Sequence, residues 1–348
     1  MSFPTSPDAM TPAWLAERLG CDPGALRGFA ATPVGTGQMC DSFRLTLDWA
    51  DGVDAPATVI AKCPSHDEAS RNIAKLTGTY VKEVSWYCEL AAGSGVAAPH
   101  CYHAEIASDE VDFILILSDL APARQGDQLA GIGLTGLLPC IEAAAGLHAL
   151  LWNDPKLETL PWLSRDNGDL VRHLFPQFYE GFRERYADRL APDLLDLGAG
   201  IVDRLDVYLA RQPAARTIVH GDLRIDNILF GPDGDTCWLV DWQTLARGSG
   251  ASDLAYLIGT SIADPFERGA ADRPAFDHWI AALGSRGVNA DADALWTDYR
   301  IGALSGYFMA VFASMSVERT TRGDEMFAVM AERPARQALA LGSLDLLG

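Results

Sequence analysis

The chain has 348 residues, of which 49% are hydrophobic and 21% are charged, and its formal net charge is −20. These values are ordinary for a folded soluble protein, and the length predicts two subdomains rather than one small domain. The negative charge argues against an extended nucleic-acid surface, because neutralising phosphates requires clustered Lys and Arg. It leaves open a solvated acidic surface or a pocket for a cationic substrate.

The seven cysteines form no C-x-x-C pair, and the opening MSFPTSPDAM lacks the basic and apolar regions of a secretory signal. We therefore expect reduced thiols and a cytoplasmic location. The most apolar stretch, IGALSGYFMAVFASM at 301–315, is too short and too rich in Gly and Ser to predict a membrane span. We interpret it as a buried helix. Nothing in the sequence determines the oligomeric state.

The first 120 residues alternate strand patterns with one prominent helix. Thr11 and Pro12 are suited to the N-cap and first turn of a helix. Alternating or β-branched residues predict strands in FRLTLDW (43–49), ATVIAKC (57–63) and VDFILILSDL (111–120). Between 34 and 43, VGTGQMCDSF predicts a glycine-bearing turn. Apolar residues at helical spacing predict a helix around 73–92.

After Ala121 the pattern becomes mainly helical. A 3.6-residue period predicts helices within 136–152, 170–190 and 194–212. The strand-like exceptions are ARTIVHGD (215–222), NILFG (227–231) and TCWLVDWQ (236–243). The last two are separated by PDGD, which predicts a hairpin. Turn-forming residues concentrate near 118–128, so we predict an N-terminal part over 1–120 and a C-terminal part over 121–348.

The stretch VHGDLRIDNILF places polar side chains between apolar ends. His220, Asp222 and Asn227 form H-x-D-x-x-x-x-N, and Asp241 follows at the end of the second hairpin strand. Hairpin geometry predicts that Asp222, Asn227 and Asp241 converge. An amide oxygen and a carboxylate suit Mg²⁺, and the remaining carboxylate could orient or deprotonate a hydroxyl. This set of groups is what phosphoryl transfer requires.

HGDLRIDN followed by VDWQ resembles the catalytic loop and metal-binding segment of small-molecule kinases with a protein-kinase-like fold. These are the aminoglycoside phosphotransferases, the choline kinases and the ecdysteroid-kinase-like proteins, and the Asp-Trp-Gln form is most similar to the last. The resemblance implies a bilobal α+β fold. Its β-rich N-lobe, with one main helix, would bind nucleotide. Its mostly helical C-lobe would carry the catalytic loop and short hairpin and bind the acceptor.

The resemblance also implies a role for each matching residue. Asp222 would be the catalytic base, supported by Asn227, while Asn227 and Asp241 would hold Mg²⁺. The remaining nucleotide-binding positions would be the phosphate-loop glycines Gly35 and Gly37, Lys62 with its partner Glu83, and a hinge at Ser118, Asp119 and Leu120. Asp253 would brace the catalytic loop. The implied cofactors are Mg²⁺ and ATP, with GTP as the alternative nucleotide.

Each residue taken alone also has an ordinary structural interpretation. Cys40 stands where a third glycine would be expected, so the phosphate loop departs from the protein-kinase form. Lys62 could be a strand lysine with its head in solvent, Glu83 a solvated helix residue, and Asp253 a helix N-cap. His220 is best interpreted as a structural histidine. The kinase interpretation depends on the ordered combination of these residues, and not on any one of them.

Three absences indicate the substrate class. No D-F-G is present. No A-P-E is present either, and eleven residues separate Asp241 from Asp253, too few for a long activation segment. Gly221 stands where many protein kinases carry the arginine that binds a phosphorylated activation loop. We therefore expect a small-molecule hydroxyl as the acceptor, with a hydrophobic or ring-containing alcohol favoured. An aminoglycoside or macrolide antibiotic kinase is the alternative. A catalytically silent nucleotide-binding regulatory module is the alternative from another class. The C-lobe aromatics that line the acceptor pocket cannot be identified from the sequence.

Overall fold

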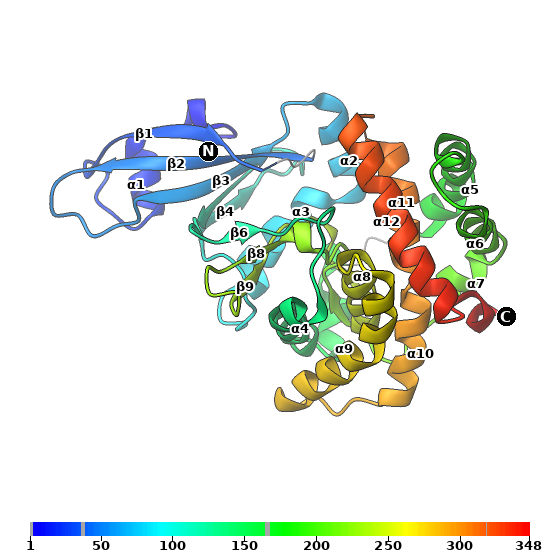
Figure 1. Cartoon of the computed structure of the whole chain (residues 1–348). Helices are drawn as coiled ribbons and strands as arrows, with labels where there is room; N and C mark the ends of the chain where they lie inside the picture. The colour runs from blue at the N-terminus through cyan, green and yellow to red at the C-terminus, as the bar shows by residue number, and fades with distance from the viewer. Residues whose placement is uncertain (1–2, 36–38, 164–167, 318) are drawn as a thin grey trace. The chain divides into compact units, whose positions relative to one another are not determined.

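The computed structural model describes residues 3–35, 39–163, 168–317 and 319–348. The chain divides into two compact units, which Figure 1 shows in one view. The first comprises Met1–Pro122 with Val240–Thr244, and the second Ala123–Leu239 with Leu245–Gly348. An antiparallel sheet dominates the first unit and helices dominate the second. The functional roles predicted for 1–120 and 121–348 stay predictions.

The first unit contains a five-stranded antiparallel sheet in the order β1-β2-β3-β5-β4. Its strands are β1 (Leu26–Pro33), β2 (Cys40–Trp49), β3 (Thr58–Pro64), β4 (Cys101–Ile106) and β5 (Phe113–Ser118). The three strands predicted from sequence are present, whereas β1 and β4 were missed. Lys62 pairs with Ser42 on one side and Leu115 on the other, which places it in the centre of the sheet.

A hydrophobic core covers one face of this sheet, because inward residues alternate along the strands. Leu45, Val59 and Ile116 are fully buried there. Helix α1 (Pro12–Arg18) packs against β1 and contributes Leu15 and Ala16 to this core. As the sequence predicts, Thr11 is the N-cap, and its Oγ1 accepts a hydrogen bond from the Trp14 amide at 3.2 Å.

The single helix predicted around 73–92 is wrong. The segment contains α2 (Glu68–Thr77), α3 (Thr79–Ser85) and a final π-helical turn, η2 (Trp86–Ala91). Gly78 separates the first two helices with φ at +71°, a left-handed conformation that glycine adopts without steric cost. Apolar periodicity continues across the break, so the sequence pattern did not reveal the break.

The second unit is mainly helical. Its helices are α4 (Leu134–Ala149), α5 (Gly168–Tyr186), α6 (Pro192–Asp203), α7 (Leu205–Ala210), α8 (Gly250–Ser261), α9 (Pro265–Ser285), α10 (Ala292–Gly302), α11 (Leu304–Ser316) and α12 (Thr321–Ala340). Among the described residues, no helix is long and apolar enough to cross a membrane. The apolar stretch at 301–315 is buried on one side, as predicted, but begins in α10 and continues in α11.

Short strands frame the polar loop of the second unit. They are β6 (Arg124–Gln125), β7 (Thr217–Val219), β8 (Ile228–Phe230), β9 (Cys237–Leu239) and β10 (Ala246–Gly248). The predicted hairpin is confirmed, because β8 pairs with β9 in the register Ile228↔Leu239. Strand β7 pairs with β10. The loop between β7 and β8 is thus anchored at both ends.

Helix α8 forms the centre of the second unit, and nearly all of its residues are buried. Close packing requires glycine on α10, where a Cβ added to Gly302 would lie 2.5 Å from the Cα of Ser252. Helices α11 and α12 run beside each other (Figure 1) and also contact α8. This packing fixes the helix that carries Asp253 and Tyr256.

Candidate functional site

In the first unit, Lys62 lies against two carboxylates. Its Nζ is 2.7 and 2.8 Å from the two Glu83 oxygens and 3.2 Å from Asp241 Oδ1. Strand β3 supplies the lysine and α3 supplies the glutamate. The Lys62 side chain is 10% exposed and that of Glu83 is 1% exposed, so this is a buried ion pair. The structure thus brings together three of the residues of this unit that the sequence predicts to act on nucleotide and metal, namely Lys62, Glu83 and Asp241.

Burial and charge act in opposite directions on this cluster. Burial alone would lower the pKa of Lys62, but the surrounding acidic groups outweigh it and raise that pKa well above the ordinary value. Burial raises the pKa of Glu83, and the Lys62 ammonium opposes that shift. Because its pKa is raised, Lys62 remains an ammonium at neutral pH, which is the form that can bind phosphate oxygens.

The segment after Asp241 braces the same ion pair. Gln243 Nε2 donates to Glu83 Oε2 at 3.2 Å and contacts Cys40 Sγ at 3.1 Å. The Trp242 ring stacks on Trp86 with centroids 4.4 Å apart. Sequence reasoning gave Gln243 no role beyond its place in VDWQ. Only the fold shows that its amide reaches the helix carrying Glu83.

Asp241 has an unusual backbone conformation, with φ at +68°. For a residue other than glycine this conformation is uncommon and costs about 1–3 kcal/mol. Its side chain is 40% exposed, and one oxygen contacts Lys62. Strained residues of this kind are concentrated at functional sites, so the conformation supports a functional role for Asp241.

In the second unit, Asp253 organises the loop that begins at His220. One oxygen of its carboxylate accepts the His220 backbone N–H at 2.5 Å, and the other accepts that of Gly221 at 3.1 Å. Gly221 has φ at +81°, a conformation that favours glycine. The Asp253 carboxylate also lies 3.3 Å from Nε2 of the buried His148. Asp253 therefore braces the loop, as the resemblance implies, and is not the N-cap of α8, which is Ser249.

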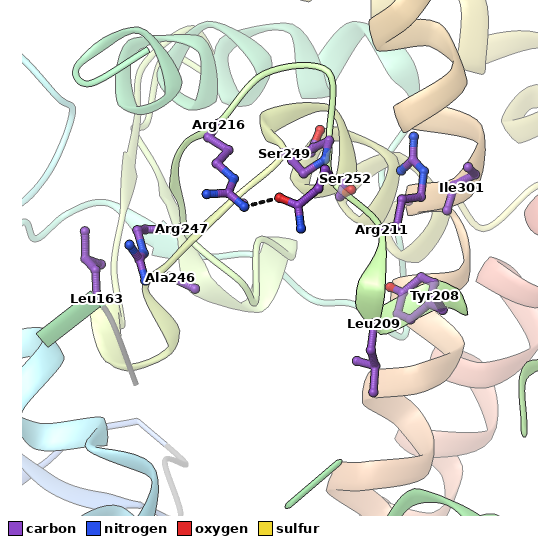
Figure 2. Close-up of a pocket in the computed structure, with 14 residues that line it drawn as sticks. Leu163, Tyr208, Leu209, Arg211, Arg216, Ala246, Arg247, Ser249, Ser252 and Ile301 are labelled. Atoms are coloured by element: carbon purple, nitrogen blue, oxygen red, sulfur yellow. Dashed lines mark hydrogen bonds between the residues drawn. The ribbon is translucent and has the colours of Figure 1, made fainter. Parts of the chain in front are cut away.

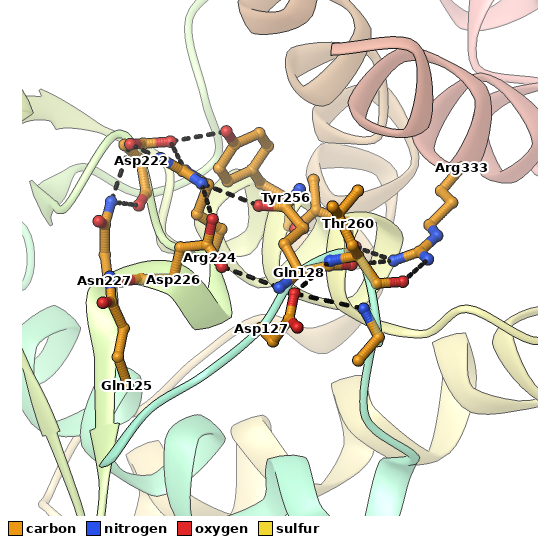
Figure 3. A network of polar contacts seen from close by, with 12 residues as sticks. Gln125, Asp127, Gln128, Asp222, Arg224, Asp226, Asn227, Tyr256, Thr260 and Arg333 are labelled. Atoms are coloured by element: carbon orange, nitrogen blue, oxygen red, sulfur yellow. Dashed lines mark hydrogen bonds and ion pairs between the residues drawn. The ribbon is translucent and has the colours of Figure 1, made fainter. Parts of the chain in front are cut away.

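Asp222 accepts hydrogen bonds from three other side chains (Figure 3). Tyr256 Oη donates to its Oδ1 at 2.7 Å, and Asn227 Nδ2 donates to its Oδ2 at 2.8 Å. Arg224 Nε lies 3.2 Å from both oxygens. Burial favours protonation of Asp222, but the Arg224 guanidinium and the Tyr256 hydroxyl outweigh it and hold its pKa below the usual value. Asp222 is therefore a carboxylate at neutral pH.

The contact of Tyr256 with Asp222 was not predicted from the sequence, and Arg224 and Asp226 were interpreted there as local turn and salt-bridge residues. Arg224 also donates to Asp226 Oδ2 at 2.7 Å and to Gln128 Oε1 at 3.0 Å, so it joins the loop to the segment before α4 (Figure 3). The available signal for Tyr256 was its position three residues after Asp253 on one helix, since residues at this spacing share a face. No pattern pointed to Gln128.

The predicted hinge has mainly structural contacts. The Ser118 amide donates to the His100 carbonyl at 2.8 Å, and the Ser118 hydroxyl accepts the His100 N–H at 3.0 Å. Asp119 binds Arg44 in a two-pronged pair, with Nε–Oδ2 at 2.6 Å and Nη2–Oδ1 at 3.1 Å. The Asp119 side chain is thus engaged within the unit. Any nucleotide contact here would use backbone groups of Asp119 or Leu120, and this role stays a prediction.

The predicted phosphate loop connects β1 to β2, whose strands pair up to Pro33↔Phe43. Gly35 has φ at +78°, which accounts for glycine at that position. Gly37 lies outside the described residues. The role of both glycines in binding phosphates therefore stays a prediction.

The donor atoms present are suitable for a magnesium ion. The Asn227 amide uses its N–H groups inward, on the Asp222 carbonyl at 2.9 Å and on its carboxylate at 2.8 Å, so its carbonyl oxygen is the atom available to a cation. Asp241 adds a partly exposed carboxylate. Both are hard oxygen ligands of the kind Mg²⁺ prefers. Asn227 and Asp241 belong to different units, and their predicted convergence stays a prediction.

Most aromatic residues of α5, α9, α10 and α11 are core residues. Phe175 and Trp279 are fully buried. Phe175 stacks on Phe308 with centroids 4.3 Å apart, and Trp296 stacks on Tyr299 at 5.1 Å. Such rings stabilise the packing of α5, α10 and α11 and leave their faces unavailable to a ligand.

Solved structures with the same fold include three small-molecule kinases. A choline kinase from Cryptosporidium parvum Iowa II has a TM-score of 0.53 and 11% identity, covering 90% of this chain and 88% of its own. A Plasmodium vivax ethanolamine kinase has a TM-score of 0.53 and 10% identity, with 87% and 81% covered. The GDP complex of an aminoglycoside 2'-phosphotransferase variant has a TM-score of 0.51 and 15% identity, with 91% and 90% covered.

At these identities the likeness establishes the fold, which is the bilobal, protein-kinase-like α+β fold expected from the sequence. No curated protein matches the chain. The family model APH, described as the phosphotransferase enzyme family, matches residues 61–295. The chain therefore belongs to the phosphotransferase enzyme family, and the resemblance stated from HGDLRIDN and VDWQ is confirmed.

Proposed function

We propose that this protein transfers the γ-phosphoryl group of a nucleoside triphosphate to a hydroxyl group of a small molecule, with Mg²⁺ as the metal. The acceptor oxygen forms a bond to phosphorus while the bond from phosphorus to the bridging β–γ oxygen breaks. The nucleoside diphosphate leaves, and the hydroxyl proton passes to Asp222. Atoms and charges balance without any further reactant.

The observation that carries this proposal is the hydrogen bonding of Asp222. Its side chain is held by Tyr256, Arg224 and Asn227 in a loop whose backbone Asp253 fixes. An oriented carboxylate can position a hydroxyl for attack and accept its proton as the oxygen–phosphorus bond forms. A carboxylate with a low pKa is a weak base, so orientation is its larger contribution.

Lys62 is proposed to bind the phosphates, held in place by Glu83. Asn227 and Asp241 are proposed to hold the metal, which when bound neutralises charge that develops on the phosphoryl oxygens. The GDP in the aminoglycoside 2'-phosphotransferase structure supports nucleotide use by this fold. We propose ATP as the donor, with GTP as the alternative.

The acceptor is proposed to be an alcohol with a hydrophobic or ring-containing body. An aminoglycoside or macrolide remains the competing acceptor, and the names of the kinases with this fold add choline and ethanolamine. A cytoplasmic location remains part of this proposal.

The test combines nucleotide binding with transfer. Thermal shift with ATP or GTP and Mg²⁺ measures binding, and transfer of labelled γ-phosphate to a set of ring alcohols, amino alcohols, aminoglycosides and macrolides measures activity. Asp222→Ala should keep nucleotide binding and lose transfer by a factor of about 10² or more. Asp188→Ala, an exposed carboxylate in the same unit, is the control.

Two outcomes would contradict the proposal. Equal turnover by the wild type and the Asp222→Ala variant would remove Asp222 from its assigned role. Binding of nucleotide by the wild type without transfer to any acceptor class would favour the alternative of a silent regulatory module.

A further inference from the structure

A cavity of about 500 Å³ lies in the second unit, at the end of β10 and the start of α8 (Figure 2). Its walls come from α7 and the segment after it, from β10, from the first turn of α8 and from the end of α10. A cavity of this size can hold an organic molecule. None of its lining residues belongs to 220–227, so it is distinct from the loop that carries Asp222.

Three arginines line this cavity: Arg211, Arg216 and Arg247. The chain has 27 Lys and Arg and 47 Asp and Glu, so its overall charge is negative. A cavity lined by three guanidinium groups is therefore opposite in charge to the chain as a whole. Guanidinium groups bind carboxylates and phosphates in a planar, two-pronged geometry. The cluster is therefore suited to an oxyanion.

The carboxylates paired with these arginines do not fully neutralise them. Arg211 Nη2 donates to Oδ1 of the fully buried Asp298. Arg216 and Arg247 share one carboxylate, Glu158. Among the residues that the structure describes, three positive charges therefore face two negative ones, which leaves one excess positive charge among these arginines and their partners.

Glu158 does not itself line the cavity, but it shows how two of the lining arginines hold a carboxylate. Arg216 Nη1 lies 3.4 Å from its Oε1, and Arg247 Nη1 donates to its Oε2. The Glu158 side chain is 57% exposed and comes from a short 3-10 helix, η3 (Pro155–Thr159). An exposed carboxylate can move into solvent at little cost, which would free two guanidinium groups for a ligand.

The remaining walls indicate the body of the ligand. Tyr208, Leu209 and Ile301 contribute apolar surface, and Ser249 and Ser252 contribute hydroxyl groups. Burial raises the pKa of Tyr208 to about 12, against the influence of Arg211, so it adds no negative charge at neutral pH. The volume exceeds what a bare phosphate ion needs, which favours an anion with an apolar body.

We propose that this cavity is a binding site for a small organic oxyanion, a phosphate monoester or a carboxylate, held by Arg216 and Arg247 with its apolar body against Tyr208 and Leu209. Phosphate and carboxylate offer the same chemistry to a guanidinium group, and the experiment distinguishes them. The proposal does not depend on phosphoryl transfer by Asp222, because binding is measured directly and without nucleotide.

The experiment is calorimetric titration of the full chain at constant ionic strength with phenyl phosphate, benzoate and inorganic phosphate. Phenyl phosphate and benzoate share a ring and differ in the charged group, so their comparison identifies the preferred head group. Inorganic phosphate lacks the apolar body and should bind more weakly than phenyl phosphate.

The variants give opposite expectations. Arg216→Gln and Arg247→Gln should each weaken binding of the tighter aromatic probe by about tenfold, the loss expected for one charge-assisted hydrogen bond. Glu158→Gln should strengthen binding, because it removes the competing carboxylate. Asp206→Asn removes an exposed carboxylate of α7 that pairs with Arg172 and not with a cavity arginine, so it should leave binding unchanged. Arg211 is left intact, since its loss would leave the buried Asp298 unpaired.

The proposal is overturned if none of the three probes binds, or if both arginine variants bind as the wild type does. It is also overturned if Asp206→Asn strengthens binding as much as Glu158→Gln, because the effect would then be general electrostatics. Thermal melting of each variant checks folding. Arg216 is the more exposed of the two arginines. If Arg247→Gln does not fold, the binding measured with Arg216→Gln alone supports or overturns the proposal.

Discussion

The two units contain charged clusters of opposite construction. In the first, one ammonium, Lys62, lies against the carboxylates of Glu83 and Asp241. In the second, one carboxylate, Asp222, accepts hydrogen bonds from an amide, a guanidinium and a hydroxyl. Lys62 projects from a central strand, whereas Asp222 lies in a loop held by side chains from other segments. The comparison indicates that sheet register positions the cation and that a side-chain network positions the carboxylate.

The largest effect is expected from breaking the buried pair of the first unit. Lys62→Met would leave Glu83 buried without its counter-charge, which costs about 3–5 kcal/mol of unfolding free energy. Urea denaturation measures this loss of unfolding free energy, and Lys156→Met, at an exposed site, is the control. Adding Glu83→Gln to Lys62→Met should recover part of the loss. If Lys62→Met were as stable as the control, the Lys62–Glu83 pair would not stabilise the fold as a buried ion pair.

A smaller effect is expected in the second unit. Three side chains donate hydrogen bonds to Asp222, so removing one of them leaves two in place. Tyr256→Phe keeps the ring and loses the hydroxyl bound to Asp222, so we expect about tenfold slower phosphoryl transfer with unchanged nucleotide affinity. Tyr299→Phe is the matched control, since it removes a buried hydroxyl that donates to Asp272 at 2.7 Å. Both variants should lose about 1 kcal/mol of stability. Equal transfer rates in the Tyr256→Phe and Tyr299→Phe variants would mean that Tyr256 does not position Asp222.

A third prediction concerns the Arg44–Asp119 pair, which joins β2 to the segment after β5 in the first unit. Burial opposes ionisation of Asp119, but the hydrogen bonds from Arg44 outweigh it and lower the Asp119 pKa. Asp119→Asn should cost about 1 kcal/mol, because Arg44 is partly exposed. Because the pKa of Asp119 is lower in the folded state, its ionised side chain stabilises the fold fully at pH values above the unfolded pKa, which is about 3.9. This stabilisation is lost as the pH falls through the folded-state pKa.

The difference in unfolding free energy between wild type and Asp119→Asn should therefore be constant from about pH 5 to 7 and shrink below about pH 4. Denaturant unfolding at several pH values measures it. A difference that persists unchanged at the most acidic pH would mean that Asp119 stabilises the fold by a route other than its charge.

The smallest effect concerns Cys40, whose Sγ contacts the Gln243 amide that also binds Glu83. Burial raises the pKa of Cys40 to about 11, so it remains a neutral thiol at pH 8, and its side chain is inaccessible. Iodoacetamide should therefore modify the exposed Cys88 first and reach Cys40 only after unfolding. Mass spectrometry of the alkylated protein identifies the order. Rapid labelling of Cys40 would show that the cluster opens to solvent.

The sequence predicted the parts of the site that depend on local spacing. The strand containing Lys62 was visible because β-branched residues surround it, and the β8–β9 hairpin was visible because PDGD separates two apolar runs. The break at Gly78 was missed, because apolar periodicity continues through it. The structural contacts of the hinge residues Ser118 and Asp119 were missed as well. Asp119 is engaged by Arg44, 75 residues earlier in the chain.

By itself, the sequence determined which reactive groups this protein contains and in what order, and these were sufficient to indicate a phosphotransferase of the kinase-like fold. Only the tertiary structure decided which neighbours hold those groups: Gln243 on Glu83, Tyr256 and Arg224 on Asp222, and three arginines around one cavity. The reason is physical. Local spacing is encoded by backbone geometry over a few residues, whereas these contacts depend on how helices and strands distant in the chain pack together.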